Sequence, residues 1–396
     1  MRVMRVVPLL VLAFTIGCGS QQKPELTNKE KGRKQWNEAR SSVLYRLAKE
    51  QFEAGNLVDC RKSLDQAASL NPDNPAIRVL SAKVAIEQGL LEPAERELRE
   101  ARTADPNNAE AYYLSGVIYQ RWQKPQEALN FYVQATEKAP ADLPYILARA
   151  EMLVSLDRRT EALGLLQERL TYFENSAAIR DAVGQLLVQS GKYAQAVPIL
   201  KQATILATDE PQLREHLALA MFYAKQYNDA VQVFQKLLKE ERYNSRADLI
   251  TALGESYMQT NRPREARDQF ITASNLEPSS VTVWLNLGKV ALQMSDVSRA
   301  ELSLKKALSL DPNRSESHLM FGYLRLNQNK LGDALQSFRK ASTLDPKDSV
   351  SVCMMGYVLE KLGKTSEAMK YYAQALRIKP NDELATTLMA QVQTHE

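Results

Sequence analysis

The sequence predicts an all-α fold, a solenoid of about ten helix–turn–helix hairpins stacked along the chain and closed by a C-terminal capping helix. Three observations predict it. Prolines recur every 34 residues, two positions of the resulting frame hold only small side chains, and a third holds only large ones. A chain of 396 residues is too long for one ordinary core, so several domains or one repeat array are expected. The common frame favours the array.

The prolines define the period of this frame. They fall into two groups, and within each group the step is 34 residues: Pro72, Pro106 and Pro140, then Pro278, Pro312, Pro346 and Pro380. The two groups are separated by four such steps and two further residues. Alignment on this spacing gives ten repeats, of which the sixth carries the two extra residues: 41–74, 75–108, 109–142, 143–176, 177–210, 211–246, 247–280, 281–314, 315–348 and 349–382.

Three columns of the alignment show that the period is structural rather than an accident of composition. The eighth residue is always small: Ala48, Ala82, Gly116, Ala150, Gly184, Ala218, Gly254, Gly288, Gly322 and Gly356. The twentieth is Cys60 in the first repeat and alanine in all the others. The twenty-fourth is always large: Leu64, Leu98, Tyr132, Leu166, Leu200, Phe234, Phe270, Leu304, Phe338 and Tyr372. Small side chains let two helix backbones approach closely, and a large one fills the space beside them.

Each repeat has the pattern of two short amphipathic helices separated by a turn. In repeat 8 the apolar residues recur at helical spacing in two runs: Val283, Leu287, Val290 and Ala291, then Ala300, Leu304, Ala307 and Leu308. The fifteenth position, between the runs, often holds Gly or Asn, which favour the left-handed conformation at a helix C-terminus. A proline beside Asp or Asn then ends the second helix and starts the next repeat.

These columns resemble the tetratricopeptide repeat, whose pattern has small residues at positions 8 and 20, an aromatic residue or Leu near 24, and Pro at 32. The resemblance covers residues 41–382. It implies ten repeats wound into a right-handed superhelix with a concave inner groove. Residues 383–396 place Leu384, Leu388 and Val392 four apart, so we expect one more helix that caps the last repeat.

The pattern weakens in repeats 4 to 6. Their terminal proline is replaced by Glu174, Thr208 and Arg242. The twenty-seventh position, which is usually small, holds Arg169 in repeat 4 and Leu237 in repeat 6. Bulky groups at a close crossing should change the angle between neighbouring repeats, so we expect altered curvature around residues 165–247. Sequence drift without structural effect is the alternative.

Residues 1–17 are typical of a bacterial signal peptide. Arg2 and Arg5 precede an apolar run over residues 6–16 that is too short to cross a bilayer as a helix. The segment from Thr15 to Cys18 resembles the lipobox of bacterial lipoproteins, although that family prefers Leu where Thr15 stands. The resemblance implies cleavage before Cys18 and acylation of this residue. A plain signal peptide, with Cys18 near the cut by chance, is the alternative.

The expected location follows from the residues after this cysteine. Residues 18–40 are expected to form the lipidated Cys18 and a polar tether. Gly19 and Ser20 do not resemble the Asp signal that retains lipoproteins in an inner membrane, so we expect an exported protein anchored to the outer membrane and facing the periplasm.

The charge balance argues against nucleic acid as a partner. The net charge of the whole chain is +4, and without the two arginines of the signal peptide 49 basic residues face 47 acidic ones. Such a balance gives no broad positive field.

No catalytic or metal-binding constellation is apparent in the sequence. The three histidines, His216, His318 and His395, are far apart along the array, and His318 occupies a packing position. No metalloprotease helix, phosphate-binding glycine loop or nucleophile elbow occurs. Cys60 and Cys353 belong to the first and tenth repeats, so a disulfide between them is not expected. We expect neither an enzyme, nor a cofactor, nor a metal.

The resemblance to the tetratricopeptide repeat implies that ligand contacts come from the first helix of each repeat, at positions 2, 5, 9, 12 and 13. The candidates for contact with a partner in the groove are Tyr113, Gln120, Arg121, Gln185, Gln189, Phe222, Tyr223, Glu255, Met258, Gln259, Lys289, Tyr323, Asn327 and Tyr357. Aromatic residues interleaved with amides and a few charges suit an extended peptide or a partner helix. The alternative for each residue is packing against the neighbouring repeat.

Three functions are compatible with these features. The first is a lipid-anchored scaffold or adaptor that binds proteins in the cell envelope, for instance in an assembly, secretion, pilus or export complex. The second is a regulatory subunit that recruits or activates an envelope enzyme such as a peptidoglycan hydrolase or synthase. The third, if the N-terminal signal is misread, is a cytoplasmic adaptor. The family's chaperone-binding clamp is not expected, because position 9 never holds Asn and Asn286 alone occupies a clamp-like position.

Overall fold

A computed structural model describes residues 27–395, and within this stretch all regular structure is α-helical. The signal peptide and Cys18 lie outside the described residues. The chain divides into two compact units, the first ending at Leu156 and the second beginning at Asp157, which we call the N-terminal and C-terminal units. The boundary falls in the turn between the two helices of repeat 4.

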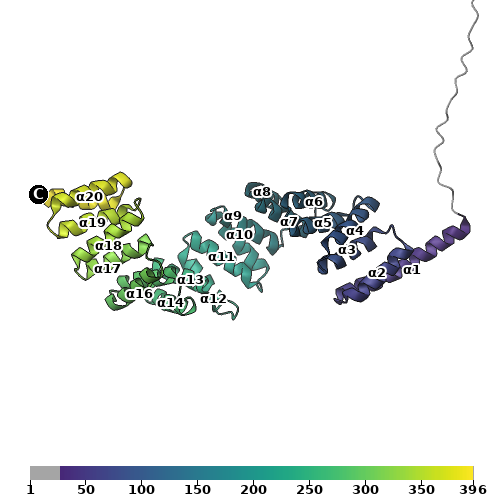
Figure 1. The fold of residues 1–396 in the computed structure, drawn as a ribbon, viewed down its shortest axis with the longest axis horizontal. Coiled ribbons are helices and arrows are strands. Elements are labelled where there is room, and N and C mark those ends of the chain that lie inside the picture. The colour runs from purple at the N-terminus through teal and green to yellow at the C-terminus, as the bar shows by residue number, and fades with distance from the viewer. Residues whose placement is uncertain (1–26, 396) are drawn as a thin grey trace, which may run out of the picture. The chain divides into compact units, whose positions relative to one another are not determined.

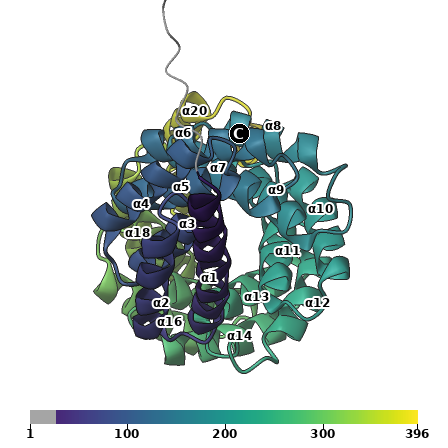
Figure 2. The same ribbon diagram turned by 90° about the vertical axis from the view of Figure 1, so that its right-hand side faces the viewer.

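The N-terminal unit consists of seven helices in its described part (Figure 1). They are α1 (Asn28–Glu53), α2 (Leu57–Leu70), α3 (Pro75–Glu87), α4 (Leu91–Ala104), α5 (Ala109–Arg121), α6 (Pro125–Lys138) and α7 (Leu143–Ser155). Odd-numbered helices are the first helices of the repeats and even-numbered ones the second helices. Within this unit, α3 and α5 lie on the inner side and α4 on the outer side (Figure 2).

The C-terminal unit continues the same alternation through its described residues. Its helices are α8 (Arg159–Arg169), α9 (Ala177–Gln189), α10 (Tyr193–Leu206), α11 (Pro211–Tyr223), α12 (Tyr227–Leu237), α13 (Ala247–Gln259), α14 (Pro263–Leu276), α15 (Val281–Gln293), α16 (Val297–Leu310), α17 (Ser315–Asn327), α18 (Leu331–Leu344), α19 (Ser349–Lys361), α20 (Thr365–Ile378) and α21 (Glu383–His395). Within this unit, α9, α11 and α13 lie on the inner side of the helical layer and α10, α12 and α14 on the outer side (Figure 2). The expected all-α solenoid is confirmed.

The small and large columns meet inside the hairpins that carry glycine at position 8, as expected. A Cβ added to Gly116 would lie 2.5 Å from the ring of Tyr132, and one added to Gly254 would lie 2.6 Å from the ring of Phe270. These distances are shorter than real carbon–carbon contacts, so only glycine lets the two helices come this close. The alanines of position 20 are fully buried, and Cys60, which replaces them in repeat 1, is buried as a compact apolar group.

The turn between the two helices has the same conformation in every repeat. The fifteenth residue has a positive φ throughout: Gly55, Gly89, Gln123, Asp157, Gly191, Lys225, Asn261, Ser295, Asn329 and Gly363. Their φ values lie between 56° and 76°. The left-handed conformation ends the first helix and turns the chain into the second, as the glycines and asparagines of this column predict.

After repeats 1, 7 and 8, a side chain of the next repeat contacts the carbonyl group at position 32. Arg78 Nε donates to Pro72 O at 3.1 Å, Trp284 Nε1 donates to Pro278 O at 2.8 Å, and His318 Nε2 lies 2.8 Å from Pro312 O. Because a carbonyl oxygen only accepts, His318 carries its proton on Nε2 in this contact. His318 therefore has a structural role, as expected, because it joins two successive repeats.

Two of the three weak repeats, repeats 4 and 6, have a shorter second helix. Helices α8 and α12 have 11 residues, whereas the other second helices of the ten repeats have 14. Both end at the residue that replaces alanine at position 27, Arg169 in one case and Leu237 in the other. Leu237 is fully buried, as are the alanines at position 27 of the other repeats, so the buried side chain at this position is larger in repeat 6. The expected change in curvature stays a prediction.

The two ends of the array differ from expectation. Residues 28–40, expected to belong to a polar tether, form the first half of α1, because Thr27 and Glu30 make a reciprocal capping box that starts the helix early. In α21, Leu388 and Val392 are buried as expected, but Leu384 is 41% exposed and Ala385 takes its place in the core. Within residues 27–395 no helix combines the length and apolar character needed to cross a bilayer.

Candidate partner-binding site

The fourteen groove candidates all lie on first helices. Three belong to the N-terminal unit and lie on α5: Tyr113, Gln120 and Arg121. The other eleven lie on α9, α11, α13, α15, α17 and α19 of the C-terminal unit.

The three candidates on α5 contact other residues of the N-terminal unit. Tyr113 stacks on Tyr145 with ring centroids 4.6 Å apart. Gln120 accepts a hydrogen bond from the hydroxyl of Tyr132 at 2.8 Å and donates to a carboxylate on α7 at 3.1 Å. Arg121 donates to the C-terminal carbonyl groups of α3, at Ile86 O, 3.0 Å away. Apart from the bond between Tyr132 and Gln120, which lies within repeat 3, these contacts connect successive repeats. The three residues thus follow the alternative of packing against a neighbouring repeat.

Five candidates from α11, α13 and α15 gather around one pocket. The pocket has a volume of about 190 Å³ and is lined by Phe222, Tyr227, Glu255, Met258, Gln259, Phe270, Asn286 and Lys289. The positions come together because α11, α13 and α15 are the first helices of three successive repeats and lie next to one another in the stack. We call these eight residues the central pocket.

Aromatic rings adjoin the central pocket on one side. Tyr223 stacks on Tyr193, with centroids 5.2 Å apart and planes 27° apart. Phe222 contacts both Tyr223 and Tyr227 edge to face. Tyr223 is 49% exposed although its ring is apolar, and an exposed Tyr that is held in place by its neighbours suits contact with a partner.

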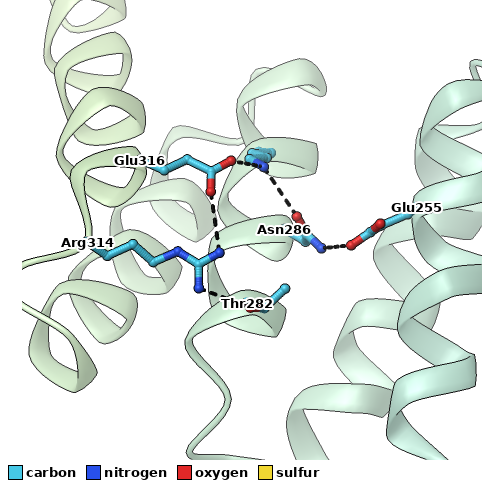
Figure 3. A network of polar contacts seen from close by, with 6 residues as sticks. Glu255, Thr282, Asn286, Arg314 and Glu316 are labelled. Atoms are coloured by element: carbon cyan, nitrogen blue, oxygen red, sulfur yellow. Dashed lines mark hydrogen bonds and ion pairs between the residues drawn. The ribbon is translucent and has the colours of Figure 1, made fainter. Parts of the chain in front are cut away.

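Three lining residues of the central pocket, Glu255, Asn286 and Lys289, belong to a polar network (Figure 3). Asn286 donates to Glu255 at 2.7 Å and lies 3.5 Å from Lys289 Nζ. Lys289 in turn pairs with Glu316 at 2.6 Å, and Arg314 lies 3.4 Å from the other oxygen of the same carboxylate. Arg314 also donates to Thr282 at 3.1 Å, which ties the network to the start of α15.

The charges in this network hold one another in place. Burial alone would raise the pKa of the Glu316 carboxyl group, but the hydrogen bond and charge of Lys289, together with Arg314, lower it overall. Glu316 is therefore an anion that fixes the Lys289 side chain at the pocket wall. The wall offers a carboxylate, an amide and an ammonium group side by side, which suits the donors and acceptors of a peptide backbone.

The remaining candidates lie along the same unit without joining the central pocket. Gln185 donates to Asp181 at 2.6 Å, and Asp181 is also 2.7 Å from His216 Nδ1. Tyr323 packs edge to face on a core ring, and burial raises its pKa to about 12. Gln189 and Asn327 are exposed near the ends of α9 and α17, and Tyr357 lies under the ammonium group of a lysine one turn on, 5.3 Å away.

Two residues of the aromatic cluster were missed by the sequence reasoning. Tyr193 and Tyr227 begin second helices, whereas the candidates were chosen from first helices. Both occupy position 17, and an aromatic residue there occurs only in these two consecutive repeats. These two consecutive aromatic residues were the sequence signal that could have identified the cluster.

Family models match most of the chain. Models of the tetratricopeptide repeat match residues 35–118 and 109–142, and a model described as "Cilia and flagella-associated protein 70 C-terminal domain" matches residues 207–396. The "TPR repeat-containing protein YpiA" of Bacillus subtilis is 24% identical over 201 residues, or 49% of this chain and 46% of that protein. The "Tetratricopeptide repeat protein 21B" of Xenopus laevis is 24% identical over 241 residues, or 59% of this chain and 18% of that protein. The chain thus matches less than half the length of either curated relative.

Among solved structures, the crystal structure of the APC/C hetero-tetramer Cut9-Hcn1 is similar with a TM-score of 0.48 and 12% identity, over 89% of this chain and 96% of that one.

Paired helices with small residues at their crossings define the class of protein, an α-solenoid of repeated hairpins. The chain carries tetratricopeptide repeats over residues 35–142, the part that models of this family match. Proteins of this family bind peptides or proteins in their groove and are generally non-catalytic scaffolds.

Proposed function

We propose that this protein is a membrane-anchored adaptor of the bacterial cell envelope that binds an extended peptide or helix of a partner protein at the central pocket. The observation that carries the proposal is the half-exposed ring of Tyr223, held by Tyr193 and Phe222 beside a pocket that polar side chains also line. An anchor of this kind combines a pre-formed aromatic surface with groups that can pair with a backbone.

The size of the central pocket limits what it can accept. A volume of about 190 Å³ holds one large side chain, not a folded element. We therefore propose that a partner inserts one apolar or aromatic side chain between Phe222 and Met258, while its backbone lies across Asn286 and Gln259. The charges of Glu255 and Lys289 cancel, so the pocket favours an uncharged peptide backbone over a strongly charged ligand.

Substitution of the exposed tyrosine tests the site. Tyr223→Ala should weaken partner binding about 30-fold, the effect of losing an anchor worth ~2 kcal/mol. Tyr172→Ala is the matched control, because Tyr172 is also exposed in the C-terminal unit but lies outside the central pocket. The measurement is the set of proteins cross-linked to and co-purified with each variant from detergent-solubilised envelopes.

The outcomes separate the candidate functions. Loss of a defined set of proteins in Tyr223→Ala, and not in Tyr172→Ala, supports the adaptor. Recovery of a single cell-wall enzyme whose activity changes on mixing would instead favour a regulatory subunit. Partner binding that survives the combined change of Phe222→Ala and Tyr223→Ala would exclude the central pocket as the binding site.

The membrane anchor is a separate part of the proposal, supported by the signal-peptide pattern and the lipobox-like segment ending at Cys18. Metabolic labelling with palmitate should label the wild-type protein and fail to label Cys18→Ala. An unlabelled wild type would remove the anchor and favour the cytoplasmic adaptor. The outer membrane, facing the periplasm, is the location we propose, and fractionation of the two membranes tests it.

A further inference from the structure

The first helix of the array carries an exposed stripe that nothing in the adaptor function uses. Lys29, Arg33, Trp36, Arg40, Val43 and Leu47 follow one another at intervals of four, three, four, three and four residues along α1, and all six are exposed. At about 100° per residue they lie within an arc of about 80° around the helix axis. We call these six residues the α1 stripe.

The α1 stripe faces away from the core of its own repeat. The buried residues of α1 are Ser41 and Ala48, which lie about 120–140° around the axis from Trp36. Ser41 donates to Ala67 O, close to the end of α2, so the first half of α1 runs on past α2 (Figure 1). Trp36 is 68% exposed, Val43 55% and Leu47 43%. Three apolar side chains in line on one exposed helix face indicate contact with something other than water.

The charges of α1 indicate what the α1 stripe contacts. Lys29, Arg33 and Arg40 lie within the stripe, and the nearest acidic residue around the axis, Glu50, lies about 20° outside its arc and one turn beyond its C-terminal end. Glu30 accepts hydrogen bonds from Thr27, and Glu38 pairs with Lys34 on the opposite face. Basic residues with a Trp between them suit an anionic lipid surface, because the ring prefers the bilayer interface and the cations pair with headgroups.

We propose that the α1 stripe docks on an anionic phospholipid surface, with α1 parallel to the bilayer. Lys29, Arg33 and Arg40 would contact headgroup phosphates, and Trp36, Val43 and Leu47 would enter the boundary between headgroups and acyl chains. The stripe is about 27 Å long at 1.5 Å per residue. A second copy of this chain is the less favoured occupant, because its own stripe offers three cations and no acidic residue to oppose them.

Vesicle binding by a non-acylated protein tests this proposal without the lipid anchor. The protein is the chain from residue 18 with Cys18→Ser, which retains all the described structure, and the vesicles are phosphatidylcholine alone or with phosphatidylglycerol. We expect co-sedimentation with the anionic vesicles that falls with added salt. The proposal rests neither on the central pocket nor on acylation, so its failure would leave the adaptor function untouched.

Two triple variants of α1 give a matched comparison. Lys29→Glu/Arg33→Glu/Arg40→Glu reverses the stripe, while Lys31→Glu/Lys34→Glu/Lys49→Glu makes the same charge change on the opposite face. Each cation near an anionic surface is worth about fivefold in affinity, so the stripe variant should bind on the order of 100-fold more weakly. The opposite-face variant should keep most of its binding. Circular dichroism of both variants checks that α1 still folds.

Tryptophan quenching gives a second, independent readout. Brominated anionic lipids should quench the fluorescence of Trp36 in the parent protein. This quenching should be absent in Trp36→Ala, which retains Trp122 and Trp284. Equal loss of binding in the two triple variants would reduce the effect to overall charge and overturn the proposal. A second outcome would also overturn the proposal: the protein does not bind vesicles but forms a concentration-dependent dimer that Trp36→Ala abolishes. The α1 stripe would then be an interface between two copies.

Discussion

The fifteenth residue of each repeat adopts the left-handed conformation whether or not it is glycine. Glycine accepts this conformation without cost, but Gln123, Lys225 and Ser295 hold it with a Cβ that meets the backbone. The cost is about 1–2 kcal/mol for an ordinary residue. These positions keep the conformation because packing of both helices of the hairpin requires the turn.

Replacing one of these strained residues should stabilise the protein. Lys225→Gly removes the steric cost at φ 61°, part of which is offset by the greater freedom of glycine in the unfolded chain. We expect a gain of about 0.5–1 kcal/mol in the free energy of unfolding, measured by urea denaturation. The control is Gln232→Gly, at an exposed site in the middle of α12, where introducing glycine should cost about 1 kcal/mol. Destabilisation by both changes would show that the turn carries no strain.

At the scale of elements, the capping helix α21 depends on its first contacts. Asp382 is buried, accepts a hydrogen bond from Ser349 at 2.7 Å and accepts another from the backbone N–H of Ala385 at 3.2 Å. The bond from Ser349 and the backbone N–H groups lower the pKa of the Asp382 carboxyl group, so it is an anion at the N-terminus of α21. One side chain thus joins α21 to α19 and caps it.

Removing this cap should loosen α21 first. Asp382→Ala should cost about 1–2 kcal/mol and increase hydrogen exchange over residues 383–392, because the helix loses both its cap and its tie to Ser349. Asp382→Asn is the control, since an Asn can still accept from the helix N-terminus. Unchanged exchange in Asp382→Ala would mean that Leu388 and Val392 alone hold the helix.

Some helix boundaries could be predicted from local sequence signals, and others could not. The hairpins, their turns and the short helices of repeats 4 and 6 coincide with local signals, such as Leu237 in place of alanine. The early start of α1 also had a local signal, the Thr27 and Glu30 capping box, which the polar composition of residues 18–40 obscured. The exposure of Leu384 had none, because it depends on how α21 rotates when it packs on α19 and α20.

At the scale of the whole molecule, stability in a repeat array is passed mainly between neighbours. Gly322 shows how a single position affects this. A Cβ there would lie 2.5 Å from the ring of Phe338, which is fully buried and has no room to move. Damage at this crossing should therefore spread to the adjoining repeats and decline with distance along the chain.

Hydrogen exchange measured along the chain tests this locality. Gly322→Ala should destabilise repeat 9 by about 1–3 kcal/mol and speed exchange in repeats 8 to 10, while the N-terminal unit stays unchanged. Gly332→Ala in the same repeat is the control, because nothing lies within 4 Å of the added carbon and the substitution should be neutral or stabilising. Faster exchange throughout the N-terminal unit in Gly322→Ala would show that the array unfolds as one cooperative body.

The sequence by itself determined the repeat, its period, the turn between helices and the crossing of small against large residues, because each of these depends on chemistry within one stretch of 34 residues. Only the tertiary structure decided which groove candidates serve a site. It ties Gln120 and Arg121 to neighbouring repeats and brings Phe222, Glu255 and Lys289 to one pocket together with Tyr227. Such contacts join residues from different repeats, and they depend on how successive helices rotate against each other, which no local pattern specifies.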